Sequence, residues 1–199
     1  MKLKIATILM TLMPSVLLLS NQGSQEKSVR DLKEEEKIIK NGTLNLSNKG
    51  LTSLNGLSEI RGIETVTKLY LDNNLLVSLP SGILAKLYNL KTLDISCNLL
   101  SLVPEEFDSL LQLEMLFLSN NFLSRLPEMN LPQLKELRIN DNSLEEFPLT
   151  LLNLANLSHI VLSGNRKLKN EAAMLELITY RRAWQQRCPL VQRNSQQVL

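Results

Sequence analysis

Leucine and isoleucine alternate with other residues in six short stretches spread along the chain. The paired apolar positions are Leu44/Leu46, Leu69/Leu71, Leu93/Ile95, Leu116/Leu118, Leu137/Ile139 and Ile160/Leu162. Successive stretches begin 25, 24, 23, 21 and 23 residues apart. Alternation with a period of two is typical of a half-buried strand, and a period of about 20–29 residues is typical of a repeat architecture. The sequence therefore predicts six repeats over residues 42–168, each containing one short strand.

An asparagine follows each stretch at a constant distance, except in the first repeat, where Lys49 stands. The set is Asn74, Asn98, Asn121, Asn142 and Asn165. A side-chain amide both donates and accepts, so it can satisfy backbone groups left unpaired where the chain turns away from a strand. The sequence predicts that these five residues stack into a structural ladder.

The connections between strands predict a bend followed by short helical turns. Four of them contain Leu79-Pro80, Val103-Pro104, Leu126-Pro127 and Phe147-Pro148, and in three of these four a helical turn is expected at a distance after the proline. Proline fixes the backbone at the bend and has no N–H for a ladder. The connection from Leu54 to Val66 is the longest and has no proline. Long helices are not expected on this side of the repeats.

The repeat form L-x-x-L-P-x-x-I/F-x-x-L-x-x-L-x-x-L-x-L-x-x-N-x-L, best matched around Phe107, resembles the short leucine-rich repeats of bacterial secreted proteins and animal Ras-scaffold proteins. Leu54-Asn55-Gly56-Leu57 instead resembles the shorter repeats of phosphatase-regulating and internalin-like proteins. The resemblance covers residues 44–168. It implies an α/β horseshoe solenoid with short parallel strands on its concave face. It also implies binding through that face, without implying any chemistry.

The first residues predict an export signal. Lys2 and Lys4 precede an apolar run that ends at Leu19 and is short for a membrane-spanning helix. Residues 1–20 are therefore interpreted as a signal peptide, with an uncleaved membrane anchor as the alternative. The expected location is secreted or periplasmic, or membrane-anchored under that alternative.

Both ends of a repeat stack need a polar-faced cap. Ser28 and Asp31 form a capping pair, which predicts an N-terminal capping helix over residues 26–41, with Asn41-Gly42 at its end. An apolar stripe with helical spacing predicts a C-terminal capping helix over residues 169–189. Residues 190–199 are expected to form a tail.

Charge separates the repeats from the C-terminal region. Residues 41–165 hold 8 Lys and Arg against 13 Asp and Glu, a net charge of −5, whereas residues 166–199 hold 7 against 2, a net charge of +5. The acidic balance argues against a nucleic-acid partner for the repeats. Cys97 and Cys188 are too few for a disulfide framework, and both are expected to be free thiols.

The residues beside and between the strand leucines are expected to point away from the core. Aromatic residues, Met and Arg are enriched in the centres of protein interfaces. The predicted partner-binding residues are Tyr70, Asp94, Met115, Phe117 and Arg138. The alternative is that these side chains only cover the sheet.

No catalytic, metal-binding or cofactor-binding site is predicted. His159 is the only histidine, and no nucleophile stands with a base and an orienting group in the pattern that catalysis needs. The sequence therefore predicts a monomeric, non-enzymatic module that binds a protein through its concave face at a host or cell-envelope interface. The alternative function is a structural envelope protein held by an uncleaved N-terminal segment.

Overall fold

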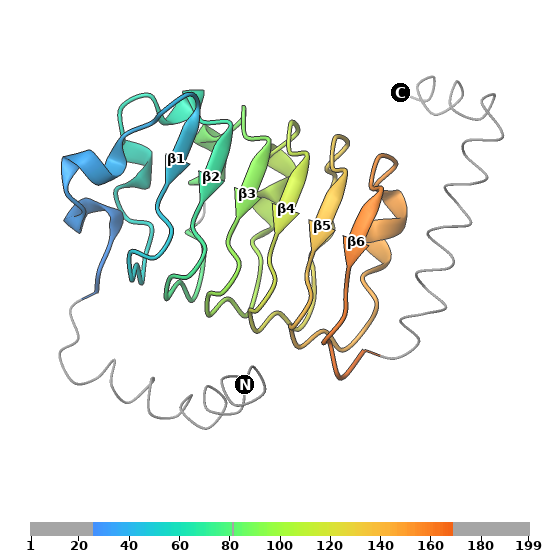
Figure 1. Ribbon diagram of the computed structural model, residues 1–199. Helices are drawn as coiled ribbons and strands as arrows, with labels where there is room; N and C mark the ends of the chain where they lie inside the picture. The colour runs from blue at the N-terminus through green and yellow to red at the C-terminus, as the bar shows by residue number, and fades with distance from the viewer. Residues whose placement is uncertain (1–25, 81, 169–199) are drawn as a thin grey trace, which may run out of the picture.

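The six predicted strands form one open parallel sheet in the computed structural model, which describes residues 26–80 and 82–168 (Figure 1). Each strand lies beside the next one in the chain. The strands are β1 (Thr43–Asn45), β2 (Lys68–Tyr70), β3 (Thr92–Asp94), β4 (Met115–Phe117), β5 (Glu136–Arg138) and β6 (His159–Val161). This arrangement confirms the predicted α/β solenoid, with one strand in each repeat.

The register stacks the first leucine of each strand on its equivalent in the next coil. Leu44 pairs with Leu69, Leu69 with Leu93, and the series continues to Ile160. Leu44, Leu93 and Leu116 are 0% exposed. Each strand is only three residues long, so burial of apolar surface between coils, at roughly 25 cal/mol per Å², is the main stabilising contribution.

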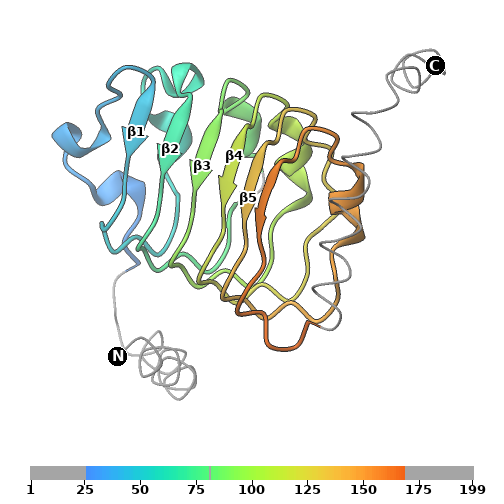
Figure 2. The same ribbon diagram turned by 45° about the vertical axis from the view of Figure 1, so that its right-hand side comes forward.

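Short 3-10 turns occupy the side of the coils opposite the strands, as predicted (Figure 2). They are η3 (Leu57–Glu59), η4 (Ile63–Thr65), η5 (Leu84–Lys86), η6 (Glu105–Ser109) and η7 (Leu149–Asn153). The connection between β4 and β5, which the structure describes throughout, contains no helical turn. There the buried Met129 N–H donates to the Thr150 hydroxyl at 2.9 Å. In this shortest repeat, the acceptor for the buried N–H therefore comes from the next coil.

The prediction of one helix over Ser28–Lys40, the core of the 26–41 cap, is wrong. The segment forms two separate 3-10 turns, η1 (Val29–Asp31) and η2 (Glu34–Lys37), with extended residues between and after them. Ser28 and Asp31 do form a capping pair, because the Asp31 carboxylate accepts from the Ser28 N–H and hydroxyl, each at 2.7 Å. The pair closes a single turn, and Val29 and Leu32 cover the first coil with 0% and 5% exposure.

Asn41-Gly42 explains why the helix does not continue. Both residues have positive φ, +51° and +70°, and the backbones of Lys40 and Thr43 exchange two hydrogen bonds of 2.9 Å. Two consecutive positive φ values between paired residues make a two-residue hairpin turn, for which Asn-Gly is the preferred sequence. The left-handed dihedrals were expected, but they fold the chain back onto β1 instead of ending a helix.

The residue one position before each ladder position has a left-handed backbone conformation, so these residues form a row beside the asparagine ladder. Its members are Asn48, Asn73, Cys97, Asn120, Asp141 and Gly164, with φ between +54° and +81°. Asn, Asp and Gly tolerate this region, whereas other side chains are strained there. Cys97 is therefore the one member of the row whose residue type does not suit its backbone.

Several predicted segments lie outside the described residues: the signal or anchor at 1–20, the capping helix at 169–189, the tail at 190–199, and Cys188. Cys97 is exposed and forms no disulfide. In the described ranges, the helical turns are too short to cross a membrane.

Candidate binding surface

The five ladder asparagines are buried and hydrogen-bonded between coils. Asn121 is typical: its Nδ2 donates to the Ile95 and Leu118 carbonyls at 3.0 and 3.1 Å, and its Oδ1 accepts from the Leu100 N–H at 3.0 Å. Its exposure is 5%. Because each amide joins its own coil to the preceding one, the ladder sets the spacing at which the strands present their outward side chains.

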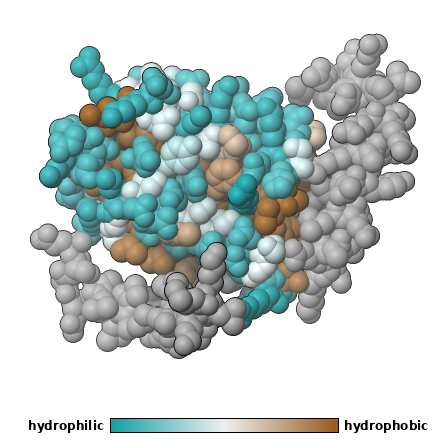
Figure 3. All heavy atoms as spheres, in the orientation of Figure 1, coloured by the Kyte–Doolittle hydropathy of each residue, from teal (hydrophilic) through white to brown (hydrophobic). Residues whose placement is uncertain are grey.

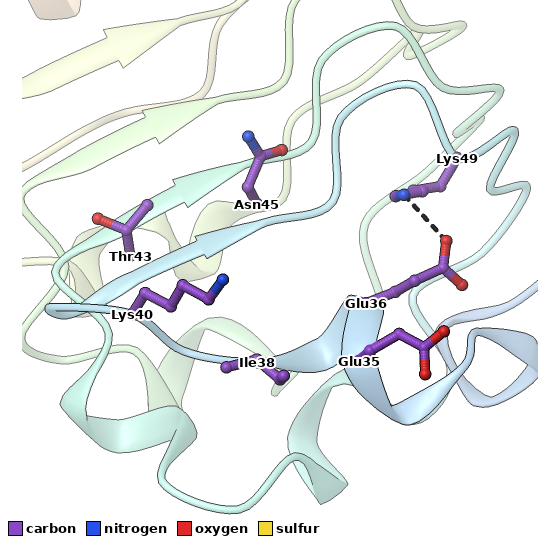
Figure 4. Close-up of a pocket in the computed structure, with 7 residues that line it drawn as sticks. All are labelled: Glu35, Glu36, Ile38, Lys40, Thr43, Asn45 and Lys49. Carbon is purple, nitrogen blue, oxygen red and sulfur yellow. Dashed lines mark hydrogen bonds and ion pairs between the residues drawn. The ribbon is translucent and has the colours of Figure 1, made fainter.

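Lys49 takes a different role in the first repeat. Its backbone N–H donates to Asn74 Oδ1 at 3.0 Å, while its side chain forms an ion pair of 2.9 Å with Glu36 of η2. This pair lies in a pocket of about 320 Å³ between the N-terminal segment and the β1 edge (Figure 4). Lys49 thus connects the N-terminal 3-10 turns to the first coil through this ion pair, a role that the repeat pattern did not indicate.

The outward side chains of the six strands form the surface that we call the sheet face. The register places Asn45, Tyr70, Asp94, Phe117, Arg138 and Val161 side by side in one row, the central row. Four of the five predicted binding residues lie in it, and Met115 lies two residues before Phe117 on the same side of β4. The sheet face is mainly hydrophilic, with apolar patches over its middle and near β6 (Figure 3).

Phe117 is half-buried and is not a free aromatic side chain. The guanidinium of Arg138 lies over its ring, 5.2 Å from the ring centroid. Arg138 Nε also donates to Glu136 Oε1 at 2.7 Å, which holds the guanidinium in place. The two predicted binding residues therefore form one unit with Glu136, a member that the sequence analysis did not select.

Asp94 is half-buried between Tyr70 and Phe117 in the central row. Its carboxylate accepts from the Ser96 N–H at 2.9 Å. Burial is the largest cause that raises the pKa of Asp94, and the negative charge of Asp72, on the segment after β2, raises it further. Hydrogen bonds from Ser96 and the positive charge of Arg138 act in the opposite direction and lower the pKa. No cation of the described residues forms an ion pair with Asp94, which distinguishes it from Glu136.

Thr92, two residues before Asp94, has a buried hydroxyl whose burial the repeat pattern of the sequence did not predict. It lies in the row of Lys68 and Met115 and is only 2% exposed. Its hydroxyl is buried without a hydrogen-bond partner among the described residues. An unpaired buried hydroxyl is destabilising, because it has lost water without gaining a replacement.

The described residues show no arrangement typical of catalysis. His159 and Ser163 are both exposed near β6. Loss of water around the Cys97 sulfur, followed by the charges of Asp94, Asp72 and Asp141, raises the pKa of the Cys97 thiol. A raised pKa keeps the thiol protonated and poorly nucleophilic. In the part of the chain that the structure describes, His, Cys, Asp and Glu form no group of three suited to a metal ion.

Comparison with known proteins agrees with this geometry. A family model described as "Leucine rich repeat" matches residues 64–123. Human oligodendrocyte-myelin glycoprotein is 34% identical in an alignment 146 residues long, which covers 62% of this chain and 32% of that protein. Bovine osteomodulin is 37% identical over 94 residues, 46% of this chain and 22% of that protein. The chain spans about a third or less of the length of the curated relatives it matches.

Solved structures show the same coil arrangement. The leucine-rich repeat domain of the type III effector XopL superposes with a TM-score of 0.57 at 27% identity, covering 63% of this chain and 45% of that one. The leucine-rich repeat ectodomain of the receptor kinase SOBIR1 from Arabidopsis thaliana gives 0.52 at 29% identity, covering 63% and 71%. With six parallel strands, a leucine core and the family match, this chain is a leucine-rich repeat protein.

Proposed function

We propose that the chain is an exported protein-binding module that holds its partner on the sheet face, the concave side of the solenoid. Proteins with leucine-rich repeats generally act as non-enzymatic modules for protein interaction, which supports the general class. The observation that carries the specific proposal is the central row, where Tyr70, Phe117 and Arg138 lie on consecutive or next-but-one strands of an open sheet.

The dimensions of the row suit the centre of an interface. Neighbouring parallel strands lie about 4.8 Å apart, so Tyr70 to Arg138 spans roughly 15 Å. Hot spots in interfaces are enriched in Trp, Tyr and Arg and cluster near the middle of the buried area. The ring of Phe117 with its Arg138 neighbour would be the anchor, and the polar side chains of the flanking rows would form the rim.

Export rests on the basic start and apolar run of residues 1–20, and the extracellular setting is supported by the SOBIR1 ectodomain among the structural relatives. Intact-mass measurement of protein recovered outside the producing cell tests this part. A mature chain that begins between Ser20 and Glu26 is expected, whereas a mass that retains Met1 would favour the anchored alternative.

Site-specific photo-crosslinking tests the binding face. A photoreactive phenylalanine at Tyr70 is expected to capture a protein that the same group at Tyr88 does not capture; Tyr88 is 53% exposed on the connection after η5. With that protein purified, Phe117→Ala is expected to weaken binding about 30-fold, or about 2 kcal/mol. Tyr88→Ala is the matched control. Equal weakening by the two variants would contradict the proposed face.

A further inference from the structure

Two aromatic rings and a carboxylate alternate in the central row. Tyr70, Asp94 and Phe117 hold equivalent positions on β2, β3 and β4. Parallel strands lie about 4.8 Å apart, so Asp94 stands on the strand between those of Tyr70 and Phe117. Aromatic faces and carboxylates both attract positive charge, the first through the ring quadrupole and the second through its full charge.

Among the described residues, the donors to the carboxylates of Asp94 and of Asp72, which lies on the segment after β2, are all neutral. Asp94 accepts from the Ser96 N–H, and Asp72 accepts from the Ser47 hydroxyl and the Asn73 amide. Two acidic side chains of the following coils have cations: Glu114, just before β4, lies between Lys91 and Lys135, and Glu136 of β5 pairs with Arg138. Among the described residues, therefore, the negative charge of Asp94 and Asp72 is left without an ion pair.

The Thr92 hydroxyl adds an independent observation. It lies on the same side of β3 as Asp94, is buried, and has no hydrogen-bond partner among the described residues. A hydroxyl can accept a hydrogen bond, and an ammonium or guanidinium group carries several donors and no acceptor. Because the hydroxyl is buried in the free chain, an incoming cation that serves both this hydroxyl and the Asp94 carboxylate must displace the side chains that cover Thr92.

The chemistry favours an organic cation over a metal ion. Ca²⁺ takes six to eight oxygen ligands, and Mg²⁺ requires a near-octahedral set, whereas this position offers two separated carboxylates flanked by rings. The chain itself supplies an example of the favoured contact, because the Arg138 guanidinium already lies over Phe117. Tyr70 is half-buried and has no such cation among the described residues.

We propose that the basic side chain of a protein partner, a lysine or an arginine, binds between Tyr70 and Phe117, with Asp94 and Asp72 as its counter-charges and Thr92 as an additional acceptor. This inference deepens the proposed function and rests on it. It predicts that the segment of the partner seated on β2–β4 is basic, which complements the net charge of −5 carried by residues 41–165.

Isothermal titration of the full chain with hexa-arginine, hexa-lysine and the neutral isostere hexa-citrulline tests the site without an identified partner. Asp94→Asn is expected to weaken hexa-arginine binding at least fivefold. Glu106→Gln, at an exposed carboxylate of η6, is the matched control and is expected to change it less than twofold. Equal losses in the two variants, or binding of hexa-citrulline as tight as that of hexa-arginine, would overturn the proposal.

Thr92→Val separates binding from folding. Removing an unpaired buried hydroxyl is expected to raise the denaturation midpoint, and yet to weaken hexa-lysine binding at least twofold. A raised midpoint with unchanged binding removes Thr92 from the site and contradicts the proposed acceptor. Sedimentation analysis of the wild type and of Asp94→Asn tests whether the site binds a second copy of this chain. If the wild type is a dimer and Asp94→Asn is a monomer, the site binds a second copy, and the proposal of a different protein partner is wrong.

The captured protein of the crosslinking experiment distinguishes the two proposals. If Phe117→Ala weakens its binding and Asp94→Asn does not, the cation site is wrong and the proposed function stands. If hexa-arginine binds at Asp94 while the captured protein is insensitive to Phe117→Ala, the proposed binding face is wrong, and the row binds cations without contacting this protein.

Discussion

The guanidinium carbon of Arg138 lies 5.2 Å from the ring centroid of Phe117, on the strand next to it in the sheet. Glu136, two residues before Arg138, accepts from its Nε at 2.7 Å and so fixes the guanidinium over the ring. A partner that reaches the middle of the sheet therefore meets an aromatic ring and a charge as one preorganised unit. Preorganisation reduces the side-chain entropy that is lost on binding.

This contact predicts a measurable coupling between the two residues. In a double-mutant cycle with Phe117→Leu and Arg138→Gln, an interaction energy of about 0.5–1 kcal/mol is expected from the cation–π contact at a partly exposed site. Urea denaturation of the four proteins measures it. Tyr70→Leu combined with Arg138→Gln is the control, because those residues lie three strands apart, and its two effects should add.

Asn121→Ala is expected to lower the free energy of unfolding by about 2–4 kcal/mol. The change leaves the Ile95 and Leu118 carbonyls and the Leu100 N–H without the side-chain partner that they have in the ladder. Lys49→Ala, at the equivalent place in the first repeat, should have a far smaller effect because it loses only a partly exposed ion pair. Similar midpoints for both variants in denaturant titration would contradict the ladder.

Cys97→Asn is expected to raise the free energy of unfolding by about 1 kcal/mol. Cys97 has φ of +56°, the conformation that Asn48, Asn73 and Asn120 adopt in other coils. Asn visits this region with less strain than Cys, because its short amide can hydrogen-bond locally. Cys97→Ala keeps the strain and should give no gain. A gain of equal size in both variants would show that the thiol, and not the dihedral angle, is the cause.

Asp94→Asn is expected to raise the denaturation midpoint at pH 7, by an amount that shrinks toward pH 3. The pKa of folded Asp94 lies above its ordinary value of 3.8, since burial and the charge of Asp72 outweigh Ser96 and Arg138. The folded chain thus binds this proton more tightly than the unfolded chain does. The stability of the wild type therefore falls as pH rises from below 3.8 through the folded pKa.

Glu114→Gln is the control of opposite sign for the pH experiment. The hydrogen bond and charge of Lys135 lower the pKa of Glu114, which is the reverse of the shift at Asp94. Its ionised form is stabilised by folding, so its neutral variant should give no gain at pH 7. Thermal denaturation of the wild type and both variants at pH 7 and pH 3 measures the two differences. A larger gain for Asp94→Asn at pH 3 than at pH 7 would contradict the predicted linkage.

The repeats could be read from the sequence because they depend on local periods. Leu90, Leu93 and Asn98 each carry information within one coil, and the same residue types return at the equivalent positions of the next coil, Leu113, Leu116 and Asn121. Parallel stacking of identical coils then leaves one register, so the members of the central row were predictable as a set. Proline at the bends accounts for the short helical turns only in part. The connection with Leu126-Pro127 has no helical turn, whereas η3 and η4 form in the connection from Leu54 to Val66, which has no proline.

The N-terminal cap was decided by tertiary contact. Asn41-Gly42 is compatible with the end of a helix and with a hairpin, since both need left-handed residues. Contacts with the first coil hold the segment in two separate turns: the Arg30 N–H donates to the Asn55 carbonyl, and the Lys49 side chain forms an ion pair with Glu36. These partners lie outside residues 28–42, so no pattern within that segment encodes them.

The chemistry of the sheet face also needed the structure. The sequence determined that Phe117, Asp94 and Arg138 point to one side, because side chains on a strand alternate. Which of these groups pair depends on distances between strands more than 20 residues apart in the chain: Arg138 covers Phe117, Glu136 holds Arg138, and Asp94 receives no cation from the described residues. Side-chain pairing across coils is a property of packing, and no single repeat contains it.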